Sequence, residues 1–241
     1  MEEIVLSIRA SLLENASEQA QESGQRYFKE TTKMYGMKTA VVNRIAKQHL
    51  VTIRQAKLNK SEIFAICDQL WSSGYIEESF VACIFSESLH KLYQVEDFEV
   101  FAKWVENDVS NWASCDTLCN HTVGDLVTIY PELTERLLMW TQSDNRWVKR
   151  AAAVSLIVPA RKGLFLPVIL QIANELLLDQ DDMVQKGYGW MLKAASEAHQ
   201  TEVFDFVMSR RAVMPRTALR YAIEKMPREL KDQAMAKPVA V

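Results

Sequence analysis

Residues 144–154 read DNRWVKRAAAV, and two later stretches follow the same plan: DDMVQKGYGWML at 181–192 and MPRTALRYAIEKM at 214–226. In each stretch a polar turn leads into a helix with small or apolar residues and an early basic residue. The three stretches begin about 35 residues apart, which is the period of stacked pairs of helices. This weak period predicts a fold built from helical repeats.

Other parts of the chain also have the spacing of amphipathic helices. The stretch SEIFAICDQLWSSG at 61–74 places apolar side chains at i, i+3, i+4, i+7 and i+8, and VEDFEVFAKWVEND at 95–108 does the same. Only 7 Gly and 6 Pro occur in 241 residues, and no stretch alternates convincingly as a strand would. We therefore expect an all-α fold, a right-handed α-solenoid of HEAT-like helical pairs with one concave groove.

Single residues predict where three of the helices begin. Ser61 is the predicted N-cap of the helix in 61–74, because its side-chain oxygen can accept a hydrogen bond from a backbone N–H group. Pro131 and Pro167 are expected in the first turn of their helices, where the missing N–H of proline leaves no hydrogen bond unmade.

The composition fits one folded domain. With 49% hydrophobic residues the chain can bury a substantial core. We expect a single HEAT-like repeat domain over 1–241 with a short flexible tail at about 236–241. No apolar run reaches the roughly 18 residues of a membrane span, and the opening MEEIVLSIRA does not have the pattern expected of a signal peptide. A cytoplasmic protein with no membrane partner is predicted.

The four cysteines do not have the spacing of a zinc site. Cys67 and Cys83 are isolated, whereas Cys115 and Cys119 form C-x-x-x-C, followed by His121. This spacing fits neither zinc fingers nor zinc ribbons. Reduced, buried thiols are expected, with no metal and no cofactor. A zinc or nucleotide enzyme is disfavoured, because the chain also lacks a Gly-rich phosphate loop.

The net charge of −3 conceals an asymmetry along the chain. Residues 145–241 carry 15 Lys and Arg against 10 Asp and Glu, whereas residues 1–144 carry 13 against 21. A basic C-terminal part can bind an anion such as phosphate. Solvated helix surfaces give the same counts, so the charge alone leaves both interpretations open.

The stretch NWASCDTLC at 111–119 combines an aromatic ring with a carboxylate. On a helix, Trp112 and Asp116 lie four residues apart and therefore face the same way. Each residue alone also fits a structural role, since tryptophan most often packs in a core and a buried carboxylate can accept hydrogen bonds. Core positions are expected for three other tryptophans, Trp71, Trp104 and Trp140.

Two later helices add basic and aromatic side chains. The first carries Trp147, Lys149 and Arg150, and the second carries Trp190 and Lys193. Arginine grips phosphate with its planar fork, and an indole face can lie against a sugar or a base. If equivalent repeats bring these helices to one groove with Asp116, the side chains suit hydrolysis of an N-glycosidic bond, whose transition state is an oxocarbenium-like sugar.

The second of these helices also contains Gly187 and Gly189. Each glycine costs a helix roughly 1 kcal/mol relative to alanine. Glycines at such positions usually allow the close approach of another helix or of a ligand backbone. We therefore expect a close neighbour at this helix.

The chain resembles the AlkD-type DNA glycosylases, the HEAT-like-repeat DNA alkylation repair enzymes. The resemblance covers most of the chain and rests on five stretches in order: YGMKTAVVNRIAK at 35–47, NWASCDTLC, NRWVKRAAAV, VQKGYGWMLK and MPRTALRYAIEKMP. Several linked motifs make it specific, although none would suffice alone. It implies a monofunctional glycosylase that acts on double-stranded DNA containing alkylated purines, without flipping the damaged base into a pocket.

The resemblance also implies roles for single residues. Trp112, Asp116 and Trp190 match the family's catalytic site, where two tryptophans hold the lesion's deoxyribose by C–H/π contacts. The aspartate stabilises the positive charge on that sugar and positions the attacking water. Arg150 matches the arginine that contacts the DNA backbone near the lesion. An alkylated purine is already a cationic leaving group, so no general acid is needed.

Two positions depart from the family pattern. Lys193 stands where some relatives have arginine, so the charge is kept but the bidentate fork is lost. Ala40 stands where relatives often have proline, at an expected helix start. We expect the first difference to change the phosphate grip and the second to have little bearing on chemistry.

Further phosphate contacts are predicted from charge and repeat position alone. Beside Arg150, the candidates are Lys149, Lys186, Lys193, Arg216 and Arg220. A capped solenoid that holds duplex DNA is expected to be monomeric. The alternative is a non-catalytic HEAT-like repeat module that binds nucleic acid or a protein partner, which suits the acidity of the whole chain.

Overall fold

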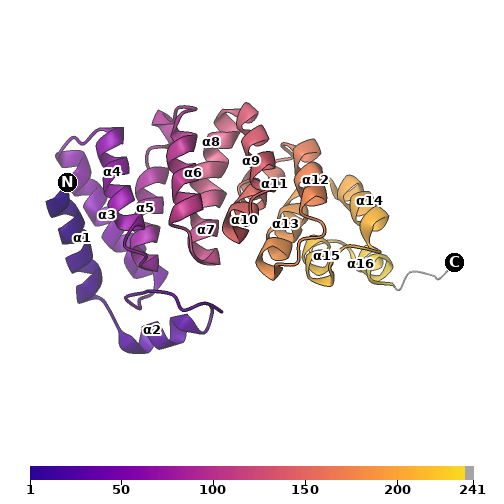
Figure 1. The fold of residues 1–241 in the computed structure, drawn as a ribbon, viewed down its shortest axis with the longest axis horizontal. Coiled ribbons are helices and arrows are strands. Elements are labelled where there is room, and N and C mark those ends of the chain that lie inside the picture. The colour runs from indigo at the N-terminus through magenta and orange to yellow at the C-terminus, as the bar shows by residue number, and fades with distance from the viewer. Residues whose placement is uncertain (237–241) are drawn as a thin grey trace. The chain divides into compact units, whose positions relative to one another are not determined.

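The structure, a computed structural model, describes residues 1–236, and every regular element in that range is helical (Figure 1). It divides into two compact units, Met1–Leu118 and Cys119–Val241. The predicted all-α repeat fold is confirmed. The single domain, the right-handed course and the concave groove stay predictions, and the expected tail at 236–241 lies outside the described residues apart from Ala236.

The first unit consists of seven α-helices and one 3-10 turn within the described residues. They are α1 (Glu2–Glu14), α2 (Glu18–Gln25), α3 (Thr39–Gln55), α4 (Lys60–Trp71), α5 (Ile76–Glu87), the 3-10 turn His90–Leu92, α6 (Asp97–Asn107) and α7 (Trp112–Leu118). Helix α5 packs against α3, α4 and α7, while α1 packs against α3 and α4. The core between them is apolar and aromatic, with Phe85, Phe101 and Trp104 fully buried.

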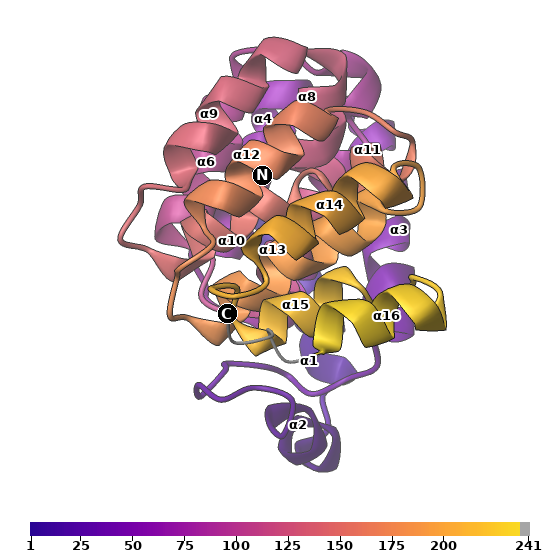
Figure 2. The same ribbon diagram turned by 90° about the vertical axis from the view of Figure 1, so that its right-hand side faces the viewer.

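Helix α2 lies apart from the other helices of its unit in both views (Figures 1 and 2). None of its residues is buried, and only the side chain of Ser17 caps its start, by accepting a hydrogen bond from Ala20 N. A non-helical segment, residues 26–38, connects it to α3. We call this segment the strap, because it runs from α2 back to the rest of the unit.

The second unit begins with a π-helical turn and contains nine α-helices within its described part. They follow the π turn Cys119–Val123 in this order: α8 (Gly124–Ile129), the 3-10 turn Pro131–Leu133, α9 (Thr134–Trp140), α10 (Arg146–Val154), α11 (Ile157–Arg161), α12 (Leu166–Glu175), α13 (Asp182–Ala195), α14 (Gln200–Arg210), α15 (Arg216–Ala222) and α16 (Arg228–Met235). Figure 2 shows the last three helices facing the viewer.

Helix α13 is the centre of the second unit, since it contacts α10, α11, α12, α14 and α15. The close approach expected at its glycines is confirmed. A Cβ atom on Gly189 would lie 2.7 Å from Cβ of Tyr221 and 2.9 Å from the carbonyl oxygen of Ala218, both on α15. A Cβ atom on Gly187 would lie 3.2 Å from Cγ of Arg150 on α10. The glycines therefore allow both neighbouring helices to pack closely.

The predicted helix starts are partly correct. Asn59, not Ser61, is the N-cap of α4: its side chain accepts from Glu62 N, and the Glu62 side chain bonds back to complete a capping box. Asparagine is as good a cap as serine and sits one turn before the acid that the box requires. Pro131 begins a 3-10 turn rather than an α-helix. Pro167 lies in the first turn of α12, as predicted.

The expectations for tryptophan and cysteine are confirmed. Trp71, Trp104 and Trp140 are buried. All four cysteines are buried and none is in a disulfide, and burial raises the pKa of the Cys67 and Cys83 thiols well above the ordinary range. No helix in the described part of the chain is long and apolar enough to cross a membrane.

Candidate nucleic-acid interface

Helix α7 is fixed at its start by uncharged hydrogen bonds. The Asn111 side chain accepts from Ser114 N at 2.9 Å and donates to Ser114 Oγ at 3.1 Å. The same hydroxyl lies 2.7 Å from Ser79 Oγ on α5. All three polar residues are buried, where hydrogen bonds are required to offset the loss of water. These contacts set both the start of α7 and its rotation against α5.

Trp112 and Asp116 lie one turn apart on α7, as the sequence predicts. The Asp116 residue is 9% exposed, and Trp112 is half-buried. Trp112 is thus accessible in part, unlike the core tryptophans. A carboxylate with little solvent around it interacts more strongly with a nearby positive charge than one in bulk water. The pair can therefore present a ring face and a poorly hydrated anion to one ligand.

The indole of Trp112 contacts the strap. Its Nε1–H group donates to the carbonyl oxygen of Tyr27 at 3.2 Å, and its ring stacks on Phe28 with centroids 5.5 Å apart and an interplanar angle of 24°. The Tyr27 side chain is 75% exposed. Neither strap residue had a sequence signal, because they lie about 85 positions before the tryptophan and carry no motif.

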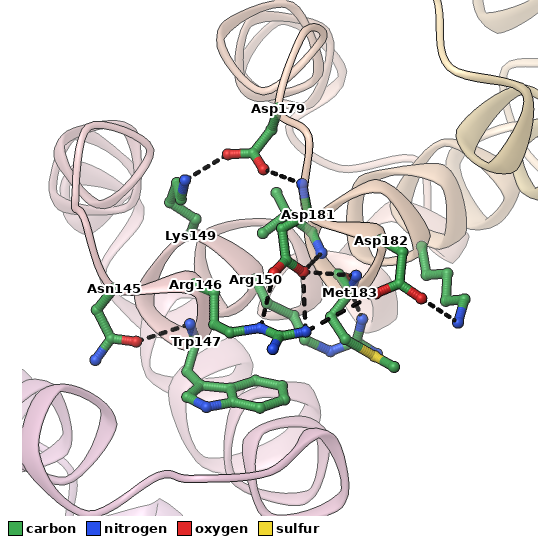
Figure 3. A network of polar contacts seen from close by, with 11 residues as sticks. Asn145, Arg146, Trp147, Lys149, Arg150, Asp179, Asp181, Asp182 and Met183 are labelled. Atoms are coloured by element: carbon green, nitrogen blue, oxygen red, sulfur yellow. Dashed lines mark hydrogen bonds and ion pairs between the residues drawn. The ribbon is translucent and has the colours of Figure 1, made fainter. Parts of the chain in front are cut away.

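In the second unit, the start of α10 meets the start of α13 through ion pairs (Figure 3). Arg146 Nε lies 2.9 Å from Asp181 Oδ2, and its Nη2 donates to Asp181 Oδ1 at 3.1 Å. Asp181 also caps α13 by accepting from Met183 N and Val184 N. One carboxylate therefore joins the two helices and ends the loop between α12 and α13.

Two predicted phosphate contacts are also paired with acids, Lys149 with an acid of this loop and Lys186 with the first residue of α13. Lys149 Nζ lies 2.5 Å from Asp179 Oδ2, and Lys186 Nζ lies 3.0 Å from Asp182 Oδ2 (Figure 3). The run DQDD at 179–182 thus places three carboxylates among the basic residues of α10 and α13. Their negative charge offsets much of the positive potential expected from the sequence.

Arg150 is 5% exposed and is held at the first turn of α13. Its Nη1 donates to the carbonyl oxygen of Met183 at 2.5 Å, and its side chain passes Gly187 without a Cβ atom in the way. The guanidinium has a fixed orientation as a result. A planar guanidinium held in this way has the charge and the donor geometry that grip an anion such as phosphate.

Trp190 and two lysines share one face of α13. Lys186, Trp190 and Lys193 are four and then three residues apart, and all three are partly exposed. Lys193 Nζ donates to Glu224 Oε2 at 2.8 Å and lies 5.6 Å from the ring centre of Tyr221. The hydrogen bond from Lys193 lowers the pKa of the Glu224 carboxyl. This lysine, which replaces the family arginine, is therefore also paired.

Arg216 and Arg220 differ from the other candidates. Both are exposed on α15, four residues apart on one face, and no ion pair joins either to a described residue. Within the second unit the structure therefore pairs Lys149 and Lys186 with acids of the run 179–182, holds Arg150 at the Met183 carbonyl, and leaves Arg216 and Arg220 in solvent. The sequence does not predict these acidic partners, because Lys149 and Arg146 meet carboxylates 30 and 35 positions away.

No cluster of three or more His, Cys, Asp or Glu side chains among residues 1–236 has the arrangement of a metal site. The candidate residues are an aromatic–acid pair in the first unit and, described separately, paired cations with an aromatic ring in the second unit. Such side chains can contact sugar faces and phosphates.

This fold defines an all-α helical-repeat protein. The model of a family described as DNA alkylation repair enzyme matches residues 8–226, so the chain belongs to that family. A solved structure described as a predicted DNA alkylation repair enzyme from Enterococcus faecalis is similar, with a TM-score of 0.78 and 15% identity over 89% of this chain and 98% of that one. That likeness shows the shared fold. The search of curated proteins found no match. The family makes DNA alkylation repair the role and DNA the substrate.

Proposed function

We propose that the protein is a monofunctional DNA glycosylase that releases positively charged N3- and N7-alkylated purines from duplex DNA without flipping the base. The observation that carries this proposal is the pair on α7, a partly accessible indole one turn from a nearly buried carboxylate. Membership of a DNA alkylation repair family supports it. We further propose that the protein acts as a cytoplasmic monomer.

The chemistry that suits this pair is the loss of a cationic base. The C–N glycosidic bond breaks, its electron pair leaves with the alkylated purine, and that base becomes neutral. The sugar is left as an oxocarbenium-like cation, which the Asp116 carboxylate stabilises. Water then adds to the anomeric carbon and gives up one proton, which completes the abasic sugar. Because the base departs uncharged, no side chain has to protonate it.

The remaining candidates have binding roles in this proposal. Trp112 and Trp190 contact the deoxyribose with their ring faces, and Arg150 directs a guanidinium at a phosphate. Lys149, Lys186, Lys193, Arg216 and Arg220 add charge along the duplex. Since each neutralised phosphate releases counterions, DNA affinity should fall as salt rises.

The test is the release of 7-methylguanine from methylated duplex DNA under single-turnover conditions. We expect the wild type to release the base, and Asp116→Asn to lower the rate constant about a hundredfold or more, since it removes the anion that faces the sugar cation. Binding to unmodified duplex should change little. Trp190→Ala should slow release less, because a ring face contributes less than a charge.

Asp205→Asn is the matched control, because it removes one exposed carboxylate of α14 without touching a candidate residue. Its release rate should equal that of the wild type. Unchanged release by Asp116→Asn would show that the carboxylate does not stabilise the sugar, and the assigned mechanism would be wrong.

The second candidate function is a non-catalytic module that binds nucleic acid or a protein partner. The observation that favours it is the pairing of Arg146, Lys149 and Lys186 with acids of the run 179–182, which lowers the positive electrostatic potential that attracts DNA. Two assays separate the candidates: retention of the protein on DNA-cellulose, and treatment of methylated plasmid with the protein followed by heat and alkali, which cut at abasic sites. Retention without cutting would favour the binding module. Nicking of the methylated plasmid after heat and alkali would select the glycosylase.

A further inference from the structure

The strap is a folded segment although it contains no helix. The Gln25 side chain at the end of α2 donates to Glu30 O at 2.7 Å and accepts from Thr32 N at 2.9 Å. Met34 is buried against α2, where a Cβ atom on Gly24 would lie 2.9 Å from its sulfur. These contacts hold the middle of the strap against α2 and give residues 27–28 a defined position.

The base of the strap is anchored in the first unit by a buried acid. The Glu77 carboxylate on α5 accepts from Tyr35 N at 3.0 Å and Gly36 N at 2.8 Å. The Tyr35 hydroxyl donates to Glu78 at 2.8 Å. Gly36 has a φ of 82°, and a Cβ atom there would lie 2.4 Å from Ser17 O, so no other residue fits. The attachment of the strap therefore depends on these residues and not on its tip.

Residues 27 and 28, which we call the tip of the strap, make a different kind of contact. Tyr27 and Phe28 are outside the core, yet the carbonyl of the first and the ring of the second both meet the indole of Trp112. The stack covers one ring face, and the hydrogen bond occupies the only donor of the side chain. Rotation of the indole would break both contacts, so the tip fixes which face remains available to a ligand.

We propose that Phe28 is a positioning residue for the glycosylase reaction, acting through Trp112. This inference rests on the proposed function. Phe28 sets the plane of the indole, so that the ring face opposite Phe28 meets the deoxyribose while Asp116 lies one turn away on the same helix. Because the indole N–H group is bound to the strap, Trp112 holds the sugar by its face alone. Misplacing a holding group by about 1 Å is known to slow reactions strongly.

The experiment compares Phe28→Ala with Phe28→Tyr in single-turnover release of 7-methylguanine. Phe28→Ala should lower the rate constant about tenfold, whereas its DNA dissociation constant and urea unfolding midpoint should stay close to those of the wild type. Phe28→Tyr keeps the ring and should retain the rate. Leu13→Ala, which removes an exposed apolar side chain of α1, is the control. A wild-type rate in Phe28→Ala, or an equal loss in both Phe28 variants, would overturn the role.

A second measurement reports on the indole without catalysis. The ¹H–¹⁵N signal of the Trp112 side chain can be identified by its disappearance in Trp112→Phe. Phe28→Ala should shift this signal and speed its hydrogen exchange, since the neighbouring ring current is lost and the hydrogen bond is loosened. An active wild type with an unshifted signal in Phe28→Ala would overturn the positioning alone. An inactive wild type would overturn both the glycosylase and this role in it.

Discussion

The start of helix α7 and the pair α10–α13 are held by different kinds of contact. At the start of α7 the contacts are uncharged: the Asn111 cap, the Ser79–Ser114 contact and the stack of Phe28 on Trp112. At α10 and α13 they are ionic: Arg146, Lys149 and Lys186 each face a carboxylate of the run 179–182.

This difference has a physical consequence for each region. Salt screens exposed ion pairs and scarcely affects buried uncharged hydrogen bonds. The α7 region should therefore keep its geometry over a wide range of salt. In the α10–α13 region, by contrast, the strength of the ion pairs and the affinity for an anion should both depend on salt and on the acids around the cations. The contacts of the α7 region should therefore be insensitive to salt, whereas those of the α10–α13 region should be sensitive to it.

The largest expected effect is a loss of stability where α13, in the ion-paired region, packs against α15. Gly189→Ala places a Cβ atom against the backbone of Ala218 and against Tyr221, neither of which can move away easily. Despite the higher helix propensity of alanine, we expect a loss of about 2 kcal/mol in the free energy of unfolding. Urea denaturation monitored by circular dichroism measures it.

Gly187→Ala is the comparison for that variant. Its Cβ atom would lie 3.2 Å from Cγ of Arg150, so this side-chain carbon has to give way by only a few tenths of an ångström, and the helix gains propensity. We expect nearly unchanged stability. Equal losses of stability in both variants would mean that the close approach of α15 to α13 is not the reason why Gly189→Ala is destabilising.

The next effect tests the uncharged cap of α7. Asn111→Ala removes the acceptor for Ser114 N and leaves that group without its partner. The free energy of unfolding should fall by about 1 kcal/mol, as for other N-cap removals. The same loss should be measured at low and at high salt. A loss that shrinks as salt rises would contradict the uncharged character assigned to this region.

The smallest effect tests the charge of the loop before α13. Asp179→Asn keeps an oxygen that can accept from Asp181 N but removes the charge that faces Lys149. Binding to unmodified duplex DNA should tighten about threefold at low salt, with a steeper salt dependence. Fluorescence anisotropy at several salt concentrations measures both. Asp205→Asn is the control, because it also removes one acid. If it tightens DNA binding as much as Asp179→Asn does, the effect comes from net charge and not from the acid that faces Lys149.

The sequence predicted more of α13 than of the strap. Asp181 precedes an apolar periodic run, so the start of α13 could be located from its cap and its spacing. The two glycines of that helix predicted a close neighbour, and α15 is that neighbour. The strap has neither period nor cap, and its contacts with α5 and α7 join positions more than 40 residues apart. Nothing local could have revealed them.

What the sequence determined by itself was the helical class, the repeat plan and the placement of Trp112 and Asp116 on one face, because these depend on local periodicity. Only the tertiary structure decided the partners: Phe28 on the indole, Met183 at Arg150, and the 179–182 carboxylates among the basic residues. The physical reason is that an interaction between distant segments depends on where each backbone is carried in space. Residue type gives a side chain its chemistry, and the folded neighbourhood decides which of its faces and donors remain available.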